Sequence, residues 1–333
     1  MEKSVKHVSI PVFVVHEGCP NTCLFCNQKK ISGKSTFSLD ESRREIEAHL
    51  ATLQGGEQVQ IAFFGGSFTA IERDKMMALL SLSDEYVEKG LVESVRLSTR
   101  PDAIDTEILD ILKEHHVQNI ELGVQSLDDS VLLKNSRGHT ADRARRAMCD
   151  VVERGFVLTG QMMTGMYGAD PESEEKTARE IIACGAREAR IYPTVVFRQT
   201  GLARLFEKGE YTPLSLEESV LRTERVYSLF KKSGVKVLRI GLCSTDGVRG
   251  DDALSTYHEA IGELVLAKHA FFKLENALER LHFKKGDRIK IYVPTREISR
   301  NVGYKKENKT ALEKKYGVTL VFEGREEFGM EVL

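Results

Sequence analysis

The chain has 333 residues, of which 41% are hydrophobic and 29% are charged, and its formal net charge is −2. This length predicts one large domain, or a large and a small one, and the composition excludes disorder, collagen and a coiled coil. No apolar run reaches the roughly 18–20 residues of a membrane span, and residues 1–19 contain no small-residue cleavage site. We therefore expect a cytoplasmic protein without a membrane partner.

Short apolar segments alternate with amphipathic segments from residue 8 to residue 240. Strands are expected at residues 8–15, 59–64, 95–98, 119–124, 157–163, 190–196 and 235–240. The helices expected between them include residues 40–53, 104–114, 141–154, 171–184 and 216–232, with Ser38, Ser130, Asp170 and Ser215 as N-caps. The pattern predicts an α/β fold with a parallel sheet, either a complete or partial β/α barrel or an open doubly wound sheet. In all of these folds ligands bind at the carboxyl ends of the strands.

After about residue 250 the rhythm changes to a compact α+β pattern. One or two long helices are expected over residues 251–281, followed by a strand at 288–293, a helix, a turn at Val302-Gly303, a basic helix to Tyr316 and a strand at 318–322. We expect a barrel over residues 1–250, a helical connector over 251–284 and a small domain over 285–333.

The C-terminal part of the chain is basic. Residues 282–316 contain eleven Lys and Arg against four Asp and Glu, a net +7 that leaves −9 for the remainder. Such a segment suggests a polyanionic partner, and the alternative is a solvated helix face.

Three of the six cysteines lie within eight residues, at Cys19, Cys23 and Cys26, directly after the first expected strand. Thiolates are the usual ligands of iron–sulfur clusters, which normally take four, so three would leave one iron open to another ligand. A zinc site is the alternative, and His16 is its candidate fourth ligand. The other cysteines, at positions 149, 184 and 243, are expected to be small buried hydrophobes.

The CxxxCxxC spacing, with Phe25 before the last cysteine, resembles the radical S-adenosylmethionine (SAM) superfamily. Gly65-Gly66 after the second strand resembles the glycine-rich turn of that superfamily. The segments at residues 98–102, 121–126, 135–140 and 192–202 resemble the radical SAM domain of the Elongator catalytic subunit, which modifies the wobble uridine of tRNA. Oxygen-independent coproporphyrinogen III oxidase is a more distant relative, and the resemblance spans about residues 8–245.

The resemblance implies a partial (β/α)6-type barrel that binds a [4Fe-4S] cluster and SAM. It implies reductive cleavage of SAM to a 5′-deoxyadenosyl radical that abstracts hydrogen, with an electron donor such as flavodoxin or ferredoxin. The residues it implies are Cys19, Cys23 and Cys26 for the cluster, Gly65 and Gly66 for the SAM amino group, Gln125 for the ribose, Arg137 for the carboxylate, and Ser98 and Gln161 as further SAM contacts. Ser98 stands where Elongator-type enzymes carry Glu, and no residue is assigned as catalytic.

Residues 298–320 are similar to the core of a KH RNA-binding domain, which places a GxxG loop between two helices. Here the loop reads Gly303-Tyr304-Lys305-Lys306, so a lysine replaces the second glycine. Too few residues follow Gly241 for the acetyltransferase domain of Elongator-type enzymes. The sequence thus predicts a radical SAM enzyme that modifies RNA, in particular tRNA, through its basic C-terminal domain. The alternatives are a radical SAM enzyme acting on a small molecule or peptide, and an iron–sulfur redox sensor that binds RNA.

Overall fold

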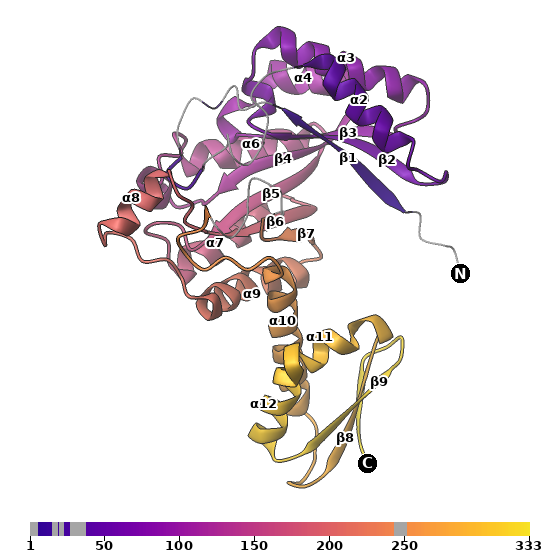
Figure 1. The fold of residues 1–333 in the computed structure, drawn as a ribbon, viewed down its shortest axis with the longest axis vertical. Helices are drawn as coiled ribbons and strands as arrows, with labels where there is room; N and C mark the ends of the chain where they lie inside the picture. Colours follow the sequence, from indigo (N-terminus) through magenta and orange to yellow (C-terminus); the bar gives the residue numbers. More distant parts are fainter. Residues whose placement is uncertain (1–5, 15–18, 20–22, 27–37, 243–251) are drawn as a thin grey trace.

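The computed structural model describes residues 6–14, 19, 23–26, 38–242 and 252–333. His16, Cys243 and most residues between the three clustered cysteines lie outside these ranges. A large curled sheet carries helices on its outer side, and a small three-stranded sheet lies beyond helix α10 (Ile261–Leu278) (Figure 1). Within the described ranges, no helix has the length and apolar character needed to cross a bilayer.

The large sheet has seven parallel strands whose order in space follows their order in the chain. They are β1 (His7–Val14), β2 (Gln58–Gly65), β3 (Ser94–Thr99), β4 (Val117–Gln125), β5 (Val157–Thr164), β6 (Glu188–Pro193) and β7 (Lys236–Ile240). The sheet curls into a half-barrel, which confirms the predicted α/β fold and partial barrel. All seven carboxyl ends therefore meet at one rim, where the fold places a ligand.

Eight helices connect these strands within the described ranges: α2 (Leu39–Leu50), α3 (Arg73–Glu88), α4 (Thr106–Glu114), α5 (Asp129–Lys134), α6 (Ala141–Glu153), α7 (Pro171–Ala183), α8 (Gly201–Glu207) and α9 (Leu216–Lys232). Ser38, Asp170 and Ser215 accept backbone hydrogen bonds as N-caps, as expected. The expectation for Ser130 is wrong, because the carboxylate of Asp128 caps α5 and accepts the backbone N–H of Ser130 at 2.8 Å.

Side chains alternate between two environments along each barrel strand. On β3, Val95 and Leu97 are fully buried in the hydrophobic core under the outer helices. Arg96 and Ser98 lie on the opposite face and bond to polar side chains of neighbouring strands inside the half-barrel. The outer face is thus a conventional apolar core, whereas the inner face is polar.

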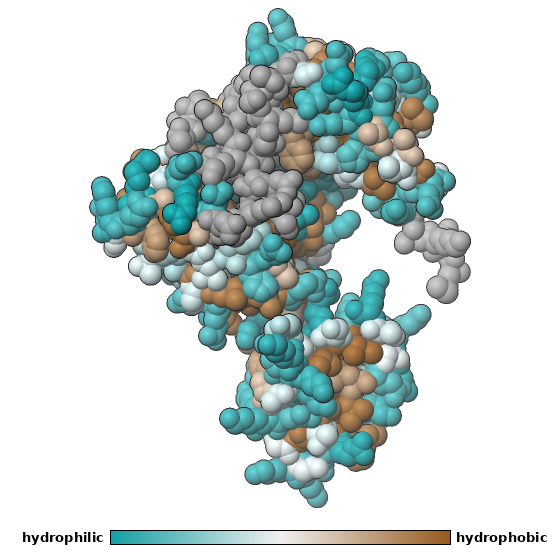
Figure 2. Space-filling view, in the orientation of Figure 1, coloured by the Kyte–Doolittle hydropathy of each residue, from teal (hydrophilic) through white to brown (hydrophobic). Residues whose placement is uncertain are grey.

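The small sheet contains β8 (Arg288–Val293), β9 (Thr319–Gly324) and β10 (Gly329–Val332), in the order β10-β8-β9 with β8 and β9 parallel. Helices α11 (Ile298–Val302) and α12 (Glu307–Tyr316) lie between β8 and β9 in the chain, as expected from the KH resemblance. Leu274 and Leu278 of α10 join the apolar core of this module, so α10 belongs to both parts of the molecule. Hydrophilic side chains cover much of the outer helices in the view of Figure 2.

One expectation about the isolated cysteines is wrong. Cys149 on α6 is exposed and Cys184 at the end of α7 is only partly buried. Burial and the adjacent Cys149 thiol raise the pKa of Cys184 to about 11. A helix surface tolerates a small residue without burying it, so an amphipathic pattern alone did not place Cys149 correctly.

Candidate active site at the rim of the half-barrel

The cysteine segment lies just beyond β1 at the rim of the half-barrel. Cys23 is buried, and Cys19 and Cys26 are half-buried. The backbone between them is fixed from two sides: Leu24 donates its N–H to the carbonyl of Asn135 at 3.2 Å, and Leu202 donates its N–H to the carbonyl of Leu24 at 2.7 Å. The segment is therefore held between the end of α5 and the start of α8. A Cβ at Gly201 would meet Cδ2 of Leu24 at 2.4 Å and its Cα at 3.3 Å, so a larger residue here would force the Leu24 side chain to move.

Two buried arginines face the thiols. Nη1 of Arg137 lies 3.2 Å from Sγ of Cys23, and Nη1 of Arg100 lies 3.9 Å from the same sulfur. Asp102 fixes Arg100 through two bonds of 2.8 Å. Burial raises the pKa of the Cys19 thiol, while Arg100 and Arg137 lower it. The two guanidinium groups therefore favour thiolates at a place where burial opposes them.

The glycine-rich turn at the end of β2 packs directly on β1. Gly65 has a φ of +118°, and a Cβ at this position would lie 2.3 Å from the carbonyl oxygen of Val14. Gly66 follows it at the rim and is half-buried. Ser67 ties the turn to the end of β3, because its hydroxyl bonds Thr99 at 2.9 Å and accepts the backbone N–H of Arg100 at 3.1 Å. Packing alone thus requires Gly65, whatever ligand the turn meets.

Gln125 and Arg137 meet next to Gly123 at a register shift in β4. Gln125 has a φ of +65°, which is rare for a residue with a side chain. Nη2 of Arg137 donates to the carbonyl of Gly123 at 2.5 Å. Oε1 of Gln125 and Nε of Arg137 are buried without a hydrogen-bond partner among the described residues. Buried polar atoms are normally satisfied, so this cradle fits a polar ligand that supplies a donor to Gln125 and an acceptor to Arg137.

His139 lies two residues after Arg137 and is also buried. Burial lowers its pKa to about 4, Arg137 and Arg100 push in the same direction, and Asp102 opposes them. The imidazole is therefore neutral at physiological pH. This histidine lies within the motif at residues 135–140, but its residue type alone gave no indication of its protonation state.

Ser98 and Gln161 lie deeper, inside the half-barrel. Nε2 of Gln161 donates to Oγ of Ser98 at 3.1 Å and to Oε2 of Glu121 at 2.8 Å. The structure thus brings these two predicted residues together, on the inner face below the cradle formed by Gln125 and Arg137.

A charged network below this pair was not predicted from the sequence. Glu121 is fully buried and pairs with Arg96 at 3.0 Å and with Arg190 at 2.9 Å, and Arg96 also pairs with Glu188 at 2.8 Å. The guanidinium of Arg190 lies over the ring of Phe64 at 5.3 Å. Charged residues at alternate positions of otherwise apolar strands were the available signal. The charges of the two arginines and the two glutamates cancel. Such a buried network fixes the positions of its side chains more than it stabilises the fold.

The described residues of the site fit a thiolate-bound cofactor but do not by themselves form a metal cage. Among the described residues, no three His, Cys, Asp or Glu side chains are gathered closely enough to hold a metal ion. A pocket of about 570 Å³ opens beside Cys19 and is lined by Thr69, Arg100, Asp102 and Asp105, among others. Thiols, flanking arginines and an unsatisfied polar cradle at one rim match a cluster with a polar organic ligand beside it.

Comparison with known proteins supports this interpretation. Residues 13–181 match the sequence model of the radical SAM superfamily, and residues 187–269 match that of the Radical_SAM C-terminal domain. An uncharacterized protein of Methanocaldococcus jannaschii is 30% identical over 210 residues, which are 59% of this chain and 64% of that protein. A tRNA uridine(34) acetyltransferase of Dehalococcoides mccartyi is 30% identical over 231 residues, which are 59% of this chain and 50% of that protein.

Among solved structures, an archaeal Elp3 from Methanocaldococcus infernus with an N-terminal deletion matches with a TM-score of 0.64 and 19% identity. The match covers 83% of this chain and 64% of that one. At this identity the likeness concerns the fold. The chain spans less than two thirds of the length of these relatives, so their complete activities do not transfer with the matched region.

Proposed function

Because the chain belongs to the radical SAM superfamily, we propose that it holds a [4Fe-4S] cluster on Cys19, Cys23 and Cys26 and uses SAM to modify an RNA. The observation that carries the proposal is the convergence of Cys23 with Arg137, whose neighbour Gln125 has an unsatisfied buried oxygen. Cys19, Cys23 and Cys26 would hold the cluster, which when bound and reduced would supply one electron for the reductive cleavage of SAM to methionine and a 5′-deoxyadenosyl radical. We propose a small one-electron carrier such as flavodoxin or ferredoxin as the donor.

The residues of the chain bind and orient SAM at the rim. Arg137 offers a planar set of donors that suits the carboxylate of SAM, and its unpartnered Nε is available for this bond. The backbone at Gly65 and Gly66 can approach the amino group of SAM closely because no Cβ intervenes. Gln125 is proposed to bind the ribose. Ser98 and Gln161 are proposed to contact SAM from inside the half-barrel. These assignments are the same as those expected from the sequence.

RNA is the proposed substrate class because of the loop between α11 and α12. Tyr304 is 65% exposed, and Lys305 and Lys306 follow it with φ values of +47° and +66°. Lys306 thus adopts the left-handed conformation that glycine takes without strain, at the position of the second glycine of a GxxG loop. A relative that carries tRNA in its name supports the same class, although this chain covers only 50% of that protein. We retain the division into residues 1–250, 251–284 and 285–333 as part of the proposal.

The test measures SAM cleavage under anaerobic conditions. The cluster is reconstituted and reduced with dithionite, SAM is added, and 5′-deoxyadenosine is quantified with bulk tRNA, with RNase-digested tRNA and without RNA. We expect formation to rise severalfold only with intact tRNA. Formation that is indifferent to tRNA would move the substrate to a small molecule or peptide. No formation by a protein with a full, reducible cluster would favour the redox-sensor alternative.

A further inference from the structure

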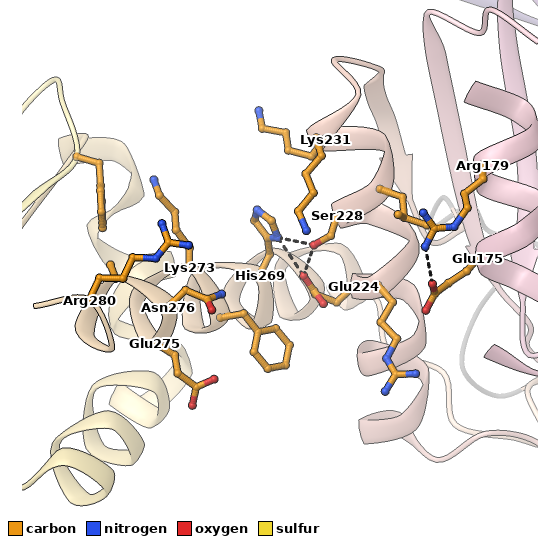
Figure 3. Close-up of a pocket in the computed structure, with 16 residues that line it drawn as sticks. Glu175, Arg179, Glu224, Ser228, Lys231, His269, Lys273, Glu275, Asn276 and Arg280 are labelled. Carbon is orange, nitrogen blue, oxygen red and sulfur yellow. Dashed lines mark hydrogen bonds and ion pairs between the residues drawn. The ribbon is translucent and has the colours of Figure 1, made fainter. Parts of the chain in front are cut away.

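A groove lies between the outer helices of the half-barrel and the C-terminal module. Its volume is about 1100 Å³, and its walls are α7, α9 and α10 together with Phe328, between β9 and β10. Figure 3 shows side chains of α9 and α10 lining it from facing sides. The groove therefore combines both parts of the chain, and none of the described residues of the cysteine segment line it.

The charges of the groove do not balance. Its acidic residues are engaged: Glu175 pairs with Arg179 at 3.0 Å, Glu275 pairs with Lys315 at 2.7 Å, and Glu224 bonds Ser228 at 2.5 Å. Five further cations line it, and within the described ranges none of them makes an ion pair: Arg225, Lys231, Lys232, Lys273 and Arg280. All five are exposed. An uncompensated positive groove attracts a polyanion.

A serine, a histidine and a glutamate also meet in the groove, but their geometry does not form a nucleophile. Nδ1 of His269 lies 3.0 Å from both Oγ of Ser228 and Oε1 of Glu224, and the Ser228 hydroxyl donates to Glu224 (Figure 3). In a catalytic triad the two ring nitrogens serve different partners, so that the histidine can remove the serine proton. Here the carboxylate accepts that proton directly. The trio joins α10 to α9 and fixes the shape of the groove.

Aromatic side chains accompany the cations. Phe272 and Phe328 line the groove and are half-buried, and Nζ of Lys273 lies 4.0 Å from the centre of the Phe328 ring. Cations that follow a phosphate backbone, combined with aromatic rings on which bases stack, are the features of a site for single-stranded nucleic acid. A soluble anion such as inorganic phosphate would need only one or two of these cations.

We propose that this groove binds the phosphate backbone of an RNA, so that α9, α10 and the C-terminal module all contact the same RNA molecule. The inference rests on the proposed function and extends it, because it places RNA contacts on the half-barrel as well as on the basic module. The bonds between His269 and α9 keep α10 in place against the half-barrel. The half-barrel and the C-terminal module would then contact the RNA at a fixed distance from each other.

The test compares two charge-reversed variants of the full-length, cluster-loaded protein. The groove variant is Lys231→Glu/Lys273→Glu, and the matched control is Lys75→Glu on α3 combined with Lys89→Glu at its C-cap, with the same change of charge. Fluorescence anisotropy with labelled bulk tRNA is measured at several salt concentrations, and cluster absorbance and thermal melting verify folding. We expect the groove variant to weaken binding about tenfold or more and to lower the salt slope by about 2. The control should keep both values.

The outcomes separate this inference from the proposed function. If the wild-type protein binds tRNA and the groove variant binds it equally well, the groove proposal is overturned while RNA remains the candidate substrate. If both variants lose binding equally, non-specific charge explains the result and the groove proposal is again overturned. If the wild-type protein binds neither tRNA nor single-stranded RNA, the proposed substrate class fails and the groove proposal fails with it.

Discussion

The rim of the half-barrel and the groove beside α10 use positive charge in opposite ways. At the rim, Arg100 and Arg137 are buried, and each is fixed by several partners within the chain. In the groove, Lys231, Lys232 and Arg280 are exposed and make no ion pair with the described residues. Fixed, buried donors suit one small ligand of defined shape, whereas exposed cations on flexible side chains suit a long polyanion. The difference is what we expect if the proposed cofactor and the proposed RNA are recognised by separate surfaces.

The largest expected effect at the rim is the loss of the proposed cluster when one thiol is removed. Cys23→Ala should prevent formation of a complete cluster, because Cys23 is the buried thiol that both arginines face. Iron and sulfide content, the absorbance near the charge-transfer bands and 5′-deoxyadenosine formation measure the effect. Cys149→Ala is the matched control, since Cys149 is exposed on α6 and should leave all three unchanged. A full complement of iron in Cys23→Ala would contradict the assignment of the site.

Substituting the buried Arg137 tests whether the rim binds SAM. Arg137→Lys keeps the charge but loses the planar donor set, so we expect SAM to bind about 10- to 100-fold more weakly to the reconstituted protein. Equilibrium dialysis with radiolabelled SAM measures the affinity. Arg143→Lys on α6 is the control and should leave affinity unchanged. Equal SAM affinity in Arg137→Lys and the wild type would remove Arg137 from the proposed cofactor site.

Gly65→Ala tests whether the rim is fixed by packing. The added Cβ would lie 2.3 Å from the carbonyl oxygen of Val14, and the φ of +118° is itself unfavourable for alanine. We expect the free energy of unfolding to fall by about 3 kcal/mol or more. Gly56→Ala is the control for backbone strain alone, because its φ is +85° but a Cβ there meets nothing within 4 Å. It should cost about 1–2 kcal/mol, and equal losses would show that the contact with β1 is unimportant.

The sequence predicted the framework of the rim more completely than its interior. Short apolar segments indicated the strands, and amphipathic segments with their caps indicated the helices. Motifs drew attention to the cysteines, Gly65, Gln125 and Arg137. The network of Arg96, Glu121, Glu188 and Arg190 could not be predicted, because its members come from β3, β4 and β6 and meet only when the sheet curls. The groove was invisible for the same reason: its cations are distributed over residues 225–280, outside the basic segment that charge counting identified.

The neutral histidine of the rim makes folding stability depend on pH. The pKa of His139 is about 4 in the folded chain against 6.5 ordinarily, with burial as the main cause. The unfolded chain therefore binds more protons between these values, so His139 contributes full stability above pH 6.5 and loses it as the pH falls toward 4. We expect a loss of about 2–3 kcal/mol over this window by urea denaturation. His139→Asn should reduce the pH dependence, and His49→Asn on α2 should retain it.

The smallest expected effect is in the basic module, where a substitution should raise the free energy of unfolding instead of lowering it. Lys306→Gly removes a left-handed conformation that costs a side-chain-bearing residue about 1–2 kcal/mol, while glycine loses more freedom on folding. We expect a net gain of about 0.5–1 kcal/mol in the unfolding free energy of the full chain. Lys309→Gly, inside α12, is the matched control and should cost about 1 kcal/mol.

The same pair of variants also tests what the strained lysine does. Each removes one positive charge, but the charge of Lys309 is paired with Glu313 at 3.7 Å. A loop that merely adds charge therefore predicts that Lys306→Gly loses at least as much tRNA affinity as Lys309→Gly. If the loop instead brings its backbone close to phosphate, glycine at position 306 allows a closer approach and offsets the lost charge. Weaker binding by Lys309→Gly than by Lys306→Gly would therefore show that the module, unlike the groove, recognises RNA through its backbone.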